Sequence, residues 1–297
     1  MRKKNLIMGV FSGYGIPQLK PWVLSINRVM SNNVEKAVGV GEASPETKQW
    51  LVSQGFRLFE LARSPMAVFT SRFWDISEYL RLHWREYDRV ITTDVKDVYF
   101  QKNPFDFLER HCIGRKGHKQ LIVGSECLSY KNEPWNNGNL LGTYGAQVYE
   151  LFKENEIFNS GVLAGSSEYI KDLAFNIYVN AVERPKCDRS LDQAVLNVLA
   201  QTQPFKDSIY FARQYEGWCC NAATTADPTK FEAYGPHLME SRPVYRDGKV
   251  YSSRGDLFFV VHQYDRVPVW KENAFKVFSE NTPPKRRFWR RTFSKSA

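Results

Sequence analysis

Short apolar runs alternate along the first half of the chain with segments in which apolar residues recur every three or four positions. The runs are typical of buried strands, and the longer spacing is typical of helices with one apolar face. The runs predict strands over residues 5–11, 35–40, 56–60, 89–93 and 121–125. The spaced segments predict a helix that begins at Pro21, a helix that begins at Ser44 and ends at Gly55, and a helix whose buried face carries Phe69, Phe73, Ile76, Leu80 and Trp84.

Strands separated by helices predict βαβ units, and therefore an α/β fold with a mainly parallel sheet flanked by helices. Ligands of such sheets bind beyond the carboxyl ends of the strands. The chemistry is therefore expected in the loops that follow Phe11, Thr93 and Ser125.

The second half of the chain is more mixed. Its pattern predicts strands over residues 157–164 and 257–261, helices over 166–182 and 190–200, and a hairpin over 244–251. The Asp-Gly pair in this hairpin is typical of a type I′ turn. The pattern ends after Phe278, which predicts a single domain over residues 1–282 and a basic, aromatic tail over 283–297.

Composition and charge narrow the class of protein. The chain has 297 residues, of which 43% are hydrophobic, and this share excludes global disorder. Its formal net charge of +9 equals the number of cations at residues 2–4 and 285–295, so residues 5–284 are neutral. A nucleic-acid reader usually carries a basic stripe on its fold. No nucleic-acid partner is therefore expected.

The same inventory indicates a cytoplasmic protein. No apolar run approaches the ~20 residues that a bilayer span needs, and the N-terminal apolar run is too short for a signal peptide. Five cysteines without a CxxC motif are typical of reduced thiols.

Two carboxylates follow the predicted strand 89–93 directly, at Asp94 and Asp97. Acidic residues are costly when buried without a partner, so this position calls for a counter-charge. A hard divalent cation such as Mg²⁺ or Mn²⁺, shared with substrate phosphates, would supply it. Alternatively, the two aspartates cap the turn or pair with Lys96 and Arg72.

This segment resembles the DxD region of GT-A glycosyltransferases, which have a Rossmann-like mixed, mainly parallel sheet. The resemblance covers about residues 5–270, and further segments match in the expected order. They are Arg72 with Phe73–Leu80, the Ser125-x-Glu126 strand end, Phe158-Asn159-Ser160-Gly161, Asp192-Gln193 with Asn197, and Val261-His262. The usual motif has acids at i and i+2, whereas here Val95 takes the first of these positions. Asp94 would then bind from a looped backbone, or contact ribose.

The resemblance implies that a sugar is transferred from a nucleotide-diphosphate donor, with a UDP-sugar as the first expectation. Asp94, Asp97 and His262 would hold Mn²⁺ or Mg²⁺, although a lone buried histidine is more often a core residue. Arg72 would contact donor phosphates or ribose, or would pin an aspartate. The nucleotide would lie against the loop Phe11-Ser12-Gly13-Tyr14.

The remaining segments would contact the sugars. The resemblance places Asn159, Ser160 and Gly161 against the donor sugar, with Asp192 and Gln193 near its anomeric carbon. Asp192 also suits the first turn of a capped helix. Glu126 would bind sugar or acceptor, or act as a base. Trp135, in a predicted Gly/Asn-rich loop, would stack on an acceptor sugar or anchor a lid. The pattern favours retention of the anomeric configuration.

The tail and the acceptor complete the hypothesis. Six basic residues and three aromatics over 285–295 suit an anionic membrane surface, which points to peripheral docking beside a glycan or lipid-linked acceptor. A solvated tail is the alternative. Two other functions stay open at this point: a metal-dependent nucleotidyltransferase, and a non-catalytic binder of sugars or RNA.

Overall fold

The structure is a computed structural model that describes residues 3–64, 66–184 and 191–279. Its strands are β1 (Lys4–Phe11), β2 (Val34–Val40), β3 (Arg57–Glu60), β4 (Tyr87–Thr93), β5 (Val98–Phe100), β6 (Leu121–Ser129), β7 (Glu156–Ser166), β8 (Ile209–Ala212), β9 (Cys219–Asn221), β10 (Val244–Arg246), β11 (Lys249–Tyr251) and β12 (Val260–His262). Its α-helices are α1 (Ile16–Val29), α2 (Pro45–Ser53), α3 (Val68–His83), α4 (Pro104–Arg110), α5 (Pro134–Phe152), α6 (Ser167–Val182), α7 (Leu191–Ala200), α8 (Ala222–Thr225), α9 (Phe231–Tyr234) and α10 (Pro268–Ser279).

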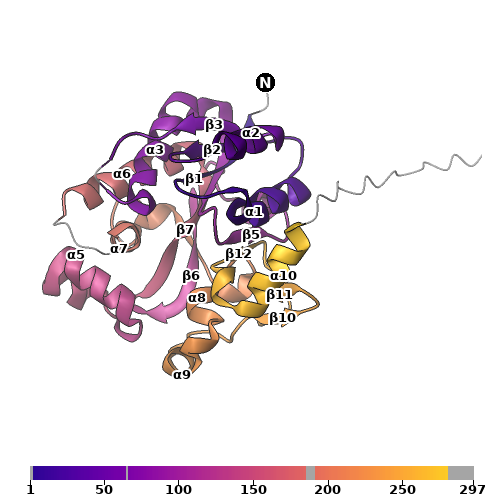
Figure 1. Cartoon of the computed structure of the whole chain (residues 1–297). Helices are drawn as coiled ribbons and strands as arrows, with labels where there is room; N and C mark the ends of the chain where they lie inside the picture. Colours follow the sequence, from indigo (N-terminus) through magenta and orange to yellow (C-terminus); the bar gives the residue numbers. More distant parts are fainter. Residues whose placement is uncertain (1–2, 65, 185–190, 280–297) are drawn as a thin grey trace, which may run out of the picture.

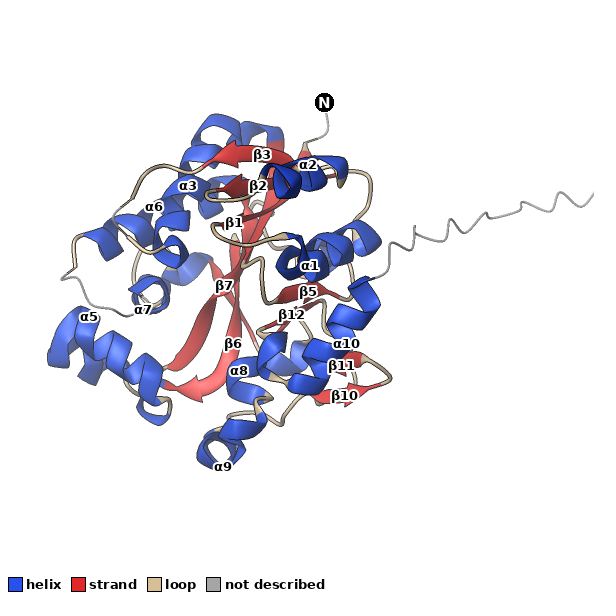
Figure 2. Ribbon diagram, in the orientation of Figure 1, coloured by secondary structure: helices blue, strands red, loops and turns tan. Residues whose placement is uncertain are grey.

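Seven strands form the central sheet, in the order β3-β2-β1-β4-β7-β6-β8. Neighbouring strands are parallel except where β7 pairs with β4 and with β6. Figure 1 and Figure 2 show helices on both sides of this sheet. The expected α/β fold with a mixed, mainly parallel sheet is confirmed.

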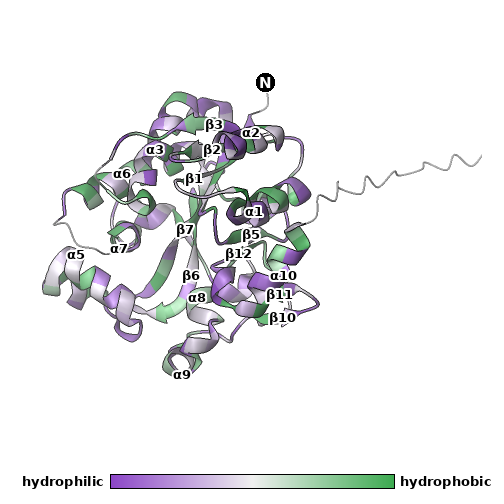
Figure 3. Cartoon of the chain, viewed as in Figure 1, coloured by the Kyte–Doolittle hydropathy of each residue, from purple (hydrophilic) through white to green (hydrophobic). Residues whose placement is uncertain are grey.

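The alternation of side chains along the strands builds two cores. In β1, Leu6 and Met8 pack with apolar residues of α3, α6 and α7, whereas Ile7 packs with those of α1, α2 and α4 on the opposite face. This follows from the two-residue period of a strand, which sends successive side chains to opposite faces. Figure 3 shows the resulting pattern, with green along the central strands and purple segments on the outer helices.

A second, smaller sheet of order β5-β12-β9 lies beside the carboxyl ends of β1 and β4. Helix α10 and the hairpin β10–β11 pack on it through a separate apolar cluster. Helices that are far apart in the sequence are also in contact here: the Lys20 ammonium on α1 donates to the Ser279 carbonyl at the end of α10, at 3.5 Å. The indigo α1 and the yellow α10 lie side by side in Figure 1.

Two local predictions are confirmed by their turn chemistry. The Ser44 hydroxyl accepts a hydrogen bond from the Thr47 amide at 3.2 Å, which caps α2 as its sequence predicts. In the hairpin, Asp247 and Gly248 have φ values of 51° and 72°. Positive φ at both central residues defines a type I′ turn.

Three predicted element boundaries are wrong. Helix α1 begins at Ile16, and Pro21 lies inside it, because burial of Leu19, Trp22 and Ile26 outweighs the loss of one backbone hydrogen bond. The last strand is β12 over Val260–His262, and Leu257 forms only an isolated bridge. The segment around Trp135 is not a loop but the start of α5, where Pro134 occupies the first turn.

Within the described residues, none of the helices combines the length and the apolar character required to cross a bilayer. The predicted tail over 283–297 lies outside the described residues.

Candidate functional site

Two adjoining cavities open at the carboxyl ends of the central parallel strands. The larger, of about 620 Å³, extends from the end of β4 toward the start of α5. The smaller, of about 260 Å³, lies against the loop after β1. Both are lined by Phe69, Arg72, Asp94, Asp97 and Arg266. The two cavities therefore share one boundary, which these five residues form.

The acidic loop between β4 and β5 places its two carboxylates at that boundary. Val95 points inward and is buried, and its side chain fills the space that the missing side chain of Gly9 leaves. The Asp94 amide donates to the Gly161 carbonyl at 2.8 Å, which fixes the loop against β7. With Val95 buried, Asp94 and Asp97 both face the cavities, three positions apart.

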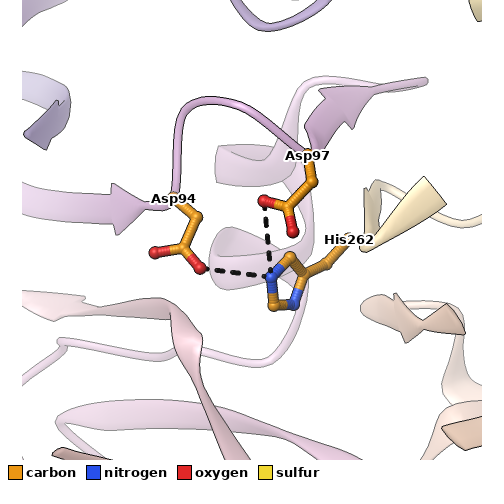
Figure 4. Close-up of side chains that lie close together, drawn as sticks. All are labelled: Asp94, Asp97 and His262. Carbon is orange, nitrogen blue, oxygen red and sulfur yellow. Dashed lines mark ion pairs between the residues drawn. The ribbon is translucent and has the colours of Figure 1, made fainter. Parts of the chain in front are cut away.

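Figure 4 shows the two aspartates converging on His262 of β12. The His262 Nε2 atom lies 3.3 Å from Asp94 Oδ2 and 3.9 Å from Asp97 Oδ1. One ligand atom from each of the three residues lies within 4.8 Å of the others. The looped backbone thus brings Asp94 to the histidine although Val95 occupies the expected motif position.

Gly161 makes room for this convergence. A Cβ atom there would lie 2.4 Å from His262 Cε1 and 2.8 Å from Asp94 Oδ2. Both distances are shorter than real carbon contacts allow, so the backbone of β7 approaches the cluster as closely as only glycine permits.

The three side chains fit a hard divalent cation. Carboxylate oxygens with one imidazole nitrogen suit Mg²⁺ and Mn²⁺. Burial lowers the pKa of His262, which favours the neutral imidazole that a metal requires. The geometry therefore matches the donor set that the sequence indicated.

Arg72 of α3 is buried and joins the acidic loop to the rest of the cavity. It forms an ion pair with Asp94, lies 3.4 Å from Asp192 Oδ2, and donates to the Ser160 carbonyl at 3.3 Å. The alternative in which Arg72 pairs with an aspartate is thus realised for Asp94. Asp97 has only His262 as an ion-pair partner within the described ranges.

The larger cavity holds a second group of polar residues, around Glu126 of β6. Its carboxylate accepts hydrogen bonds from the amides of Asn159 at 2.6 Å, Gln193 at 3.2 Å and Asn136 at 3.2 Å. Burial raises the pKa of Glu126, and the donations from Asn159 and Gln193 oppose this shift. All three partners are donors, so this carboxylate is enclosed by a cage of side-chain amides.

Asp192, in the first turn of α7, lies next to this amide cage. Its carboxylate accepts from the Ser160 hydroxyl at 2.8 Å. Burial raises the pKa of Asp192, while Arg72 and the Ser160 hydroxyl lower it. Gln193 follows on the same helix and accepts from the Ser160 amide at 3.3 Å. The sequence motifs around Ser160 and Asp192 therefore meet in space, as the resemblance implied.

The loop after β1 lines the smaller cavity through Phe11, Ser12 and Tyr14. Phe11 is only 1% exposed and stacks beneath Tyr14, with ring centroids 6.3 Å apart. Phe11 therefore supports Tyr14, and little of its own ring is accessible from the cavity. Gly13 is not among the residues that line either cavity, and its φ of 79° lies in the left-handed region that favours glycine in this turn.

Several lining residues carry no signal in the sequence. Arg266 lies at the shared boundary in a short 3₁₀ turn after β12, and Lys230 and Asp227 line the outer part of the larger cavity. The exposed fractions of Phe69 and Trp135 are 42% and 52%. The prediction that Phe69 is buried is wrong, because the first turn of α3 lies beside the cavities and Phe69 lines them.

Solved structures of glycosyltransferases share this architecture. One is the glycosyltransferase GlyE of Streptococcus pneumoniae TIGR4, with a TM-score of 0.52, 15% identity and 93% of this chain covered. Its apo form gives a TM-score of 0.54. The apo structure of the bifunctional glycosyltransferase WbbM gives a TM-score of 0.58 at 11% identity, with 95% of this chain covered.

The chain has the fold of these glycosyltransferases. It spans 62% of the GlyE chain and 50% of the WbbM chain, so both are longer proteins. No protein-family model matches the sequence, and no curated protein matches it. The glycosyltransferase fold is therefore established through three-dimensional similarity alone.

Proposed function

We propose that this protein is a metal-dependent glycosyltransferase that moves a sugar from a nucleotide-diphosphate donor to a glycan or glycolipid acceptor. The observation that carries the proposal is the cluster of Asp94, Asp97 and His262 at the boundary of two cavities, on a glycosyltransferase fold. A donor of this class consists of a nucleoside and a sugar joined by a diphosphate. Its three parts correspond to the smaller cavity, the larger cavity and the cluster between them.

The smaller cavity would hold the nucleoside. Tyr14 offers an aromatic face that is held in place by Phe11 beneath it, and stacking on such a face is favourable for any base. Ser12 adds a hydroxyl on the same loop. A UDP-sugar is the first donor to test.

The diphosphate would lie at the boundary. Asp94, Asp97 and His262 would hold Mn²⁺ or Mg²⁺, which supplies neutralisation of the charge that develops on the departing diphosphate. Arg72 and Arg266 line both cavities. Their guanidinium groups would hold phosphate oxygens by charge-assisted hydrogen bonds.

The larger cavity would hold the donor sugar. Asn159, Ser160 and Asp192 present an amide, a hydroxyl and a carboxylate on adjacent elements, and these groups suit sugar hydroxyls. Glu126 is already bonded to three amides, so it would orient those amides rather than act as a base. The Asn-Ser-Gly and Asp-Gln motifs, which meet at Ser160, favour a retaining reaction.

The acceptor would enter at the outer part of the larger cavity. Trp135 is half exposed there, at the start of α5. Its ring can cover the apolar face of a sugar, in which C–H groups point to one side.

A thermal-shift panel of UDP-, GDP- and CMP-sugars, each with and without Mn²⁺, tests this function. One donor is expected to raise the melting temperature only with Mn²⁺, and Asp97→Ala should abolish this response. Asp172→Ala, which changes an exposed carboxylate on α6, is the control. A protein that responds to no donor would contradict the proposal.

The stereochemical outcome is tested separately with the donor so identified. An NMR time course of transfer or hydrolysis should show the retained anomer as the first product. The inverted anomer as first product would overturn the retaining assignment and leave the donor class intact.

A further inference from the structure

Asn221, the last residue of β9, lies directly behind His262. The two residues are register partners in the parallel pair β9–β12, so their side chains lie next to each other on one face. Asn221 is 0% exposed and His262 is 2% exposed. The Asn221 Oδ1 atom lies 3.0 Å from His262 Nδ1.

The orientation of the Asn221 amide is fixed by its other contacts. Its Nδ2 atom donates to the carbonyls of Gly124 at 3.3 Å and Ser125 at 2.9 Å. A reversed amide would place its oxygen against these two carbonyl oxygens, which would repel it. The oxygen of Asn221 therefore faces the histidine, and a carboxamide oxygen can only accept a hydrogen bond.

The acceptor decides which ring nitrogen of His262 carries the hydrogen. Nδ1 must donate to Asn221, so in the neutral ring Nε2 is left with its lone pair. That lone pair faces Asp94 Oδ2 and Asp97 Oδ1. Two carboxylates and a lone pair that face one another form a donor set for a cation.

We propose that Asn221 is a positioning residue that holds His262 in its Nδ1–H tautomer and so keeps Nε2 available as a metal donor. The metal part of this inference rests on the proposed function, whereas the tautomer rests on the hydrogen bonds alone. Because Asn221 also binds two carbonyls of β6, it attaches the histidine to the strand that carries Glu126.

The first test is a long-range ¹H–¹⁵N NMR spectrum of the five histidines of the full chain, recorded at mildly alkaline pH with Mg²⁺ present. His262→Gln identifies the signal of residue 262. Hydrogen on Nδ1 with a bare Nε2 is the expected pattern. Hydrogen on Nε2 with a bare Nδ1 would overturn the proposal.

The second test is Mn²⁺ binding measured by isothermal titration calorimetry. Loss of such an outer partner typically weakens metal binding about 10–100-fold, and this is the change expected for Asn221→Leu. Thr225→Val is the matched control, because Thr225 is equally buried and its hydroxyl donates to the Asn221 backbone carbonyl, at 2.7 Å. Equal Mn²⁺ affinity of Asn221→Leu and the unchanged protein would refute the positioning role.

The two tests separate this inference from the proposed function. If the unchanged protein binds no Mn²⁺, the metal-dependent function fails while the spectrum still decides the tautomer. If Asn221→Leu does not fold, the spectrum of the unchanged protein remains the deciding measurement.

Discussion

Among the carboxylates that line the larger cavity, two pairs are in opposite states. The side chains of Asp94 and Asp97 are 28% and 17% exposed, and they converge on one histidine. Glu126 and Asp192 are 3% and 4% exposed, and each is bonded by donors from neighbouring elements. The first pair has bonding capacity left for a ligand, whereas the second pair has spent most of its capacity on the protein. Carboxylates that look alike in the sequence therefore have different roles.

Asp97→Asn gives the largest expected effect, because it removes a charge from the pair of Asp94 and Asp97, which has bonding capacity left for a ligand. Transfer activity, measured with the donor that the thermal-shift panel identifies, should fall by about 100-fold or more. This corresponds to the several kcal/mol that a metal contributes to a transition state. The free energy of unfolding in urea should change little, since no donor within the described residues bonds this side chain. Full activity of the variant would contradict the metal role of Asp97.

Gly161→Ala would disturb the cluster of Asp94, Asp97 and His262 from the backbone of β7. The new Cβ atom would meet His262 Cε1 at 2.4 Å, so the histidine or Asp94 must move. Mn²⁺ affinity measured by calorimetry should fall about 10–100-fold, as for a displaced ligand. Gly142→Ala is the control, because nothing lies within 4 Å of a Cβ atom there. Similar affinities for the two variants would show that the close approach is unimportant.

Glu126→Gln alters one of the two enclosed carboxylates, Glu126 and Asp192, and should lower the free energy of unfolding. The new side chain would keep an oxygen toward Asn159 and Gln193, but its NH2 group would face the donating amide of Asn136. A buried group that loses its hydrogen bonds costs about 1–3 kcal/mol, so the free energy of unfolding should fall by an amount of this order. Urea unfolding monitored by tryptophan fluorescence measures it. A variant as stable as the unchanged protein would refute the enclosed state of Glu126.

Asp75 is a buried carboxylate that lies outside the larger cavity. It lies on α3, one turn after Arg72, and burial raises its pKa from 3.8 to about 6, although it accepts a hydrogen bond from the Ala62 amide. Protonated Asp75 is thus favoured by folding, and its contribution to stability is present below pH 4 and is lost as pH rises through about 6.

Asp75→Asn should therefore unfold like the unchanged protein near pH 4 and be more stable above pH 6. The shift of about two pKa units corresponds to about 3 kcal/mol at most, and because solvent screening reduces this value the expected gain is on the order of 1–2 kcal/mol. Urea unfolding at both pH values measures this. A constant difference between the two proteins at every pH would contradict the raised pKa.

Removal of residues 283–297 should leave both pairs of carboxylates unaffected. Sedimentation with anionic vesicles should decrease, because each basic residue near such a surface contributes about 1 kcal/mol. The thermal shift with Mn²⁺ and donor should not change. Unchanged sedimentation would remove the membrane hypothesis, and a lost donor response would show that the tail belongs to the site.

The sequence predicts the parallel half of the fold well, because strands such as β1 and β4 contain apolar runs that are buried on both faces. The small sheet is a different case. Strands β5, β9 and β12 have three residues each, which is too short for any period to be detected. The start of α5 was mistaken for a loop because its glycines and asparagines suggest turns, while Pro134 and the cap at Glu133 initiate a helix.

The site was predictable only where several residues of one motif lie together. Asp94, Ser160 and Asp192 belong to such motifs, and the fold brings them to one cavity. Arg266 and Asn221 are isolated in the sequence, since the first follows a turn and the second ends a three-residue strand. Their positions depend on long-range strand pairing, which no local pattern encodes.

Arg72 is bonded at once to Asp94, to Asp192 and to the Ser160 carbonyl. A ligand that draws Asp94 away from Arg72 would leave the guanidinium to interact with Asp192 alone. A ligand that engages Asp192 would leave it to interact with Asp94. If ligands in the two cavities compete for this charge, each would alter the affinity of the other by an equal factor, because such linkage is reciprocal. Under the proposed function the two halves of one donor would then bind cooperatively, and the intact donor would bind differently from the sum of its fragments.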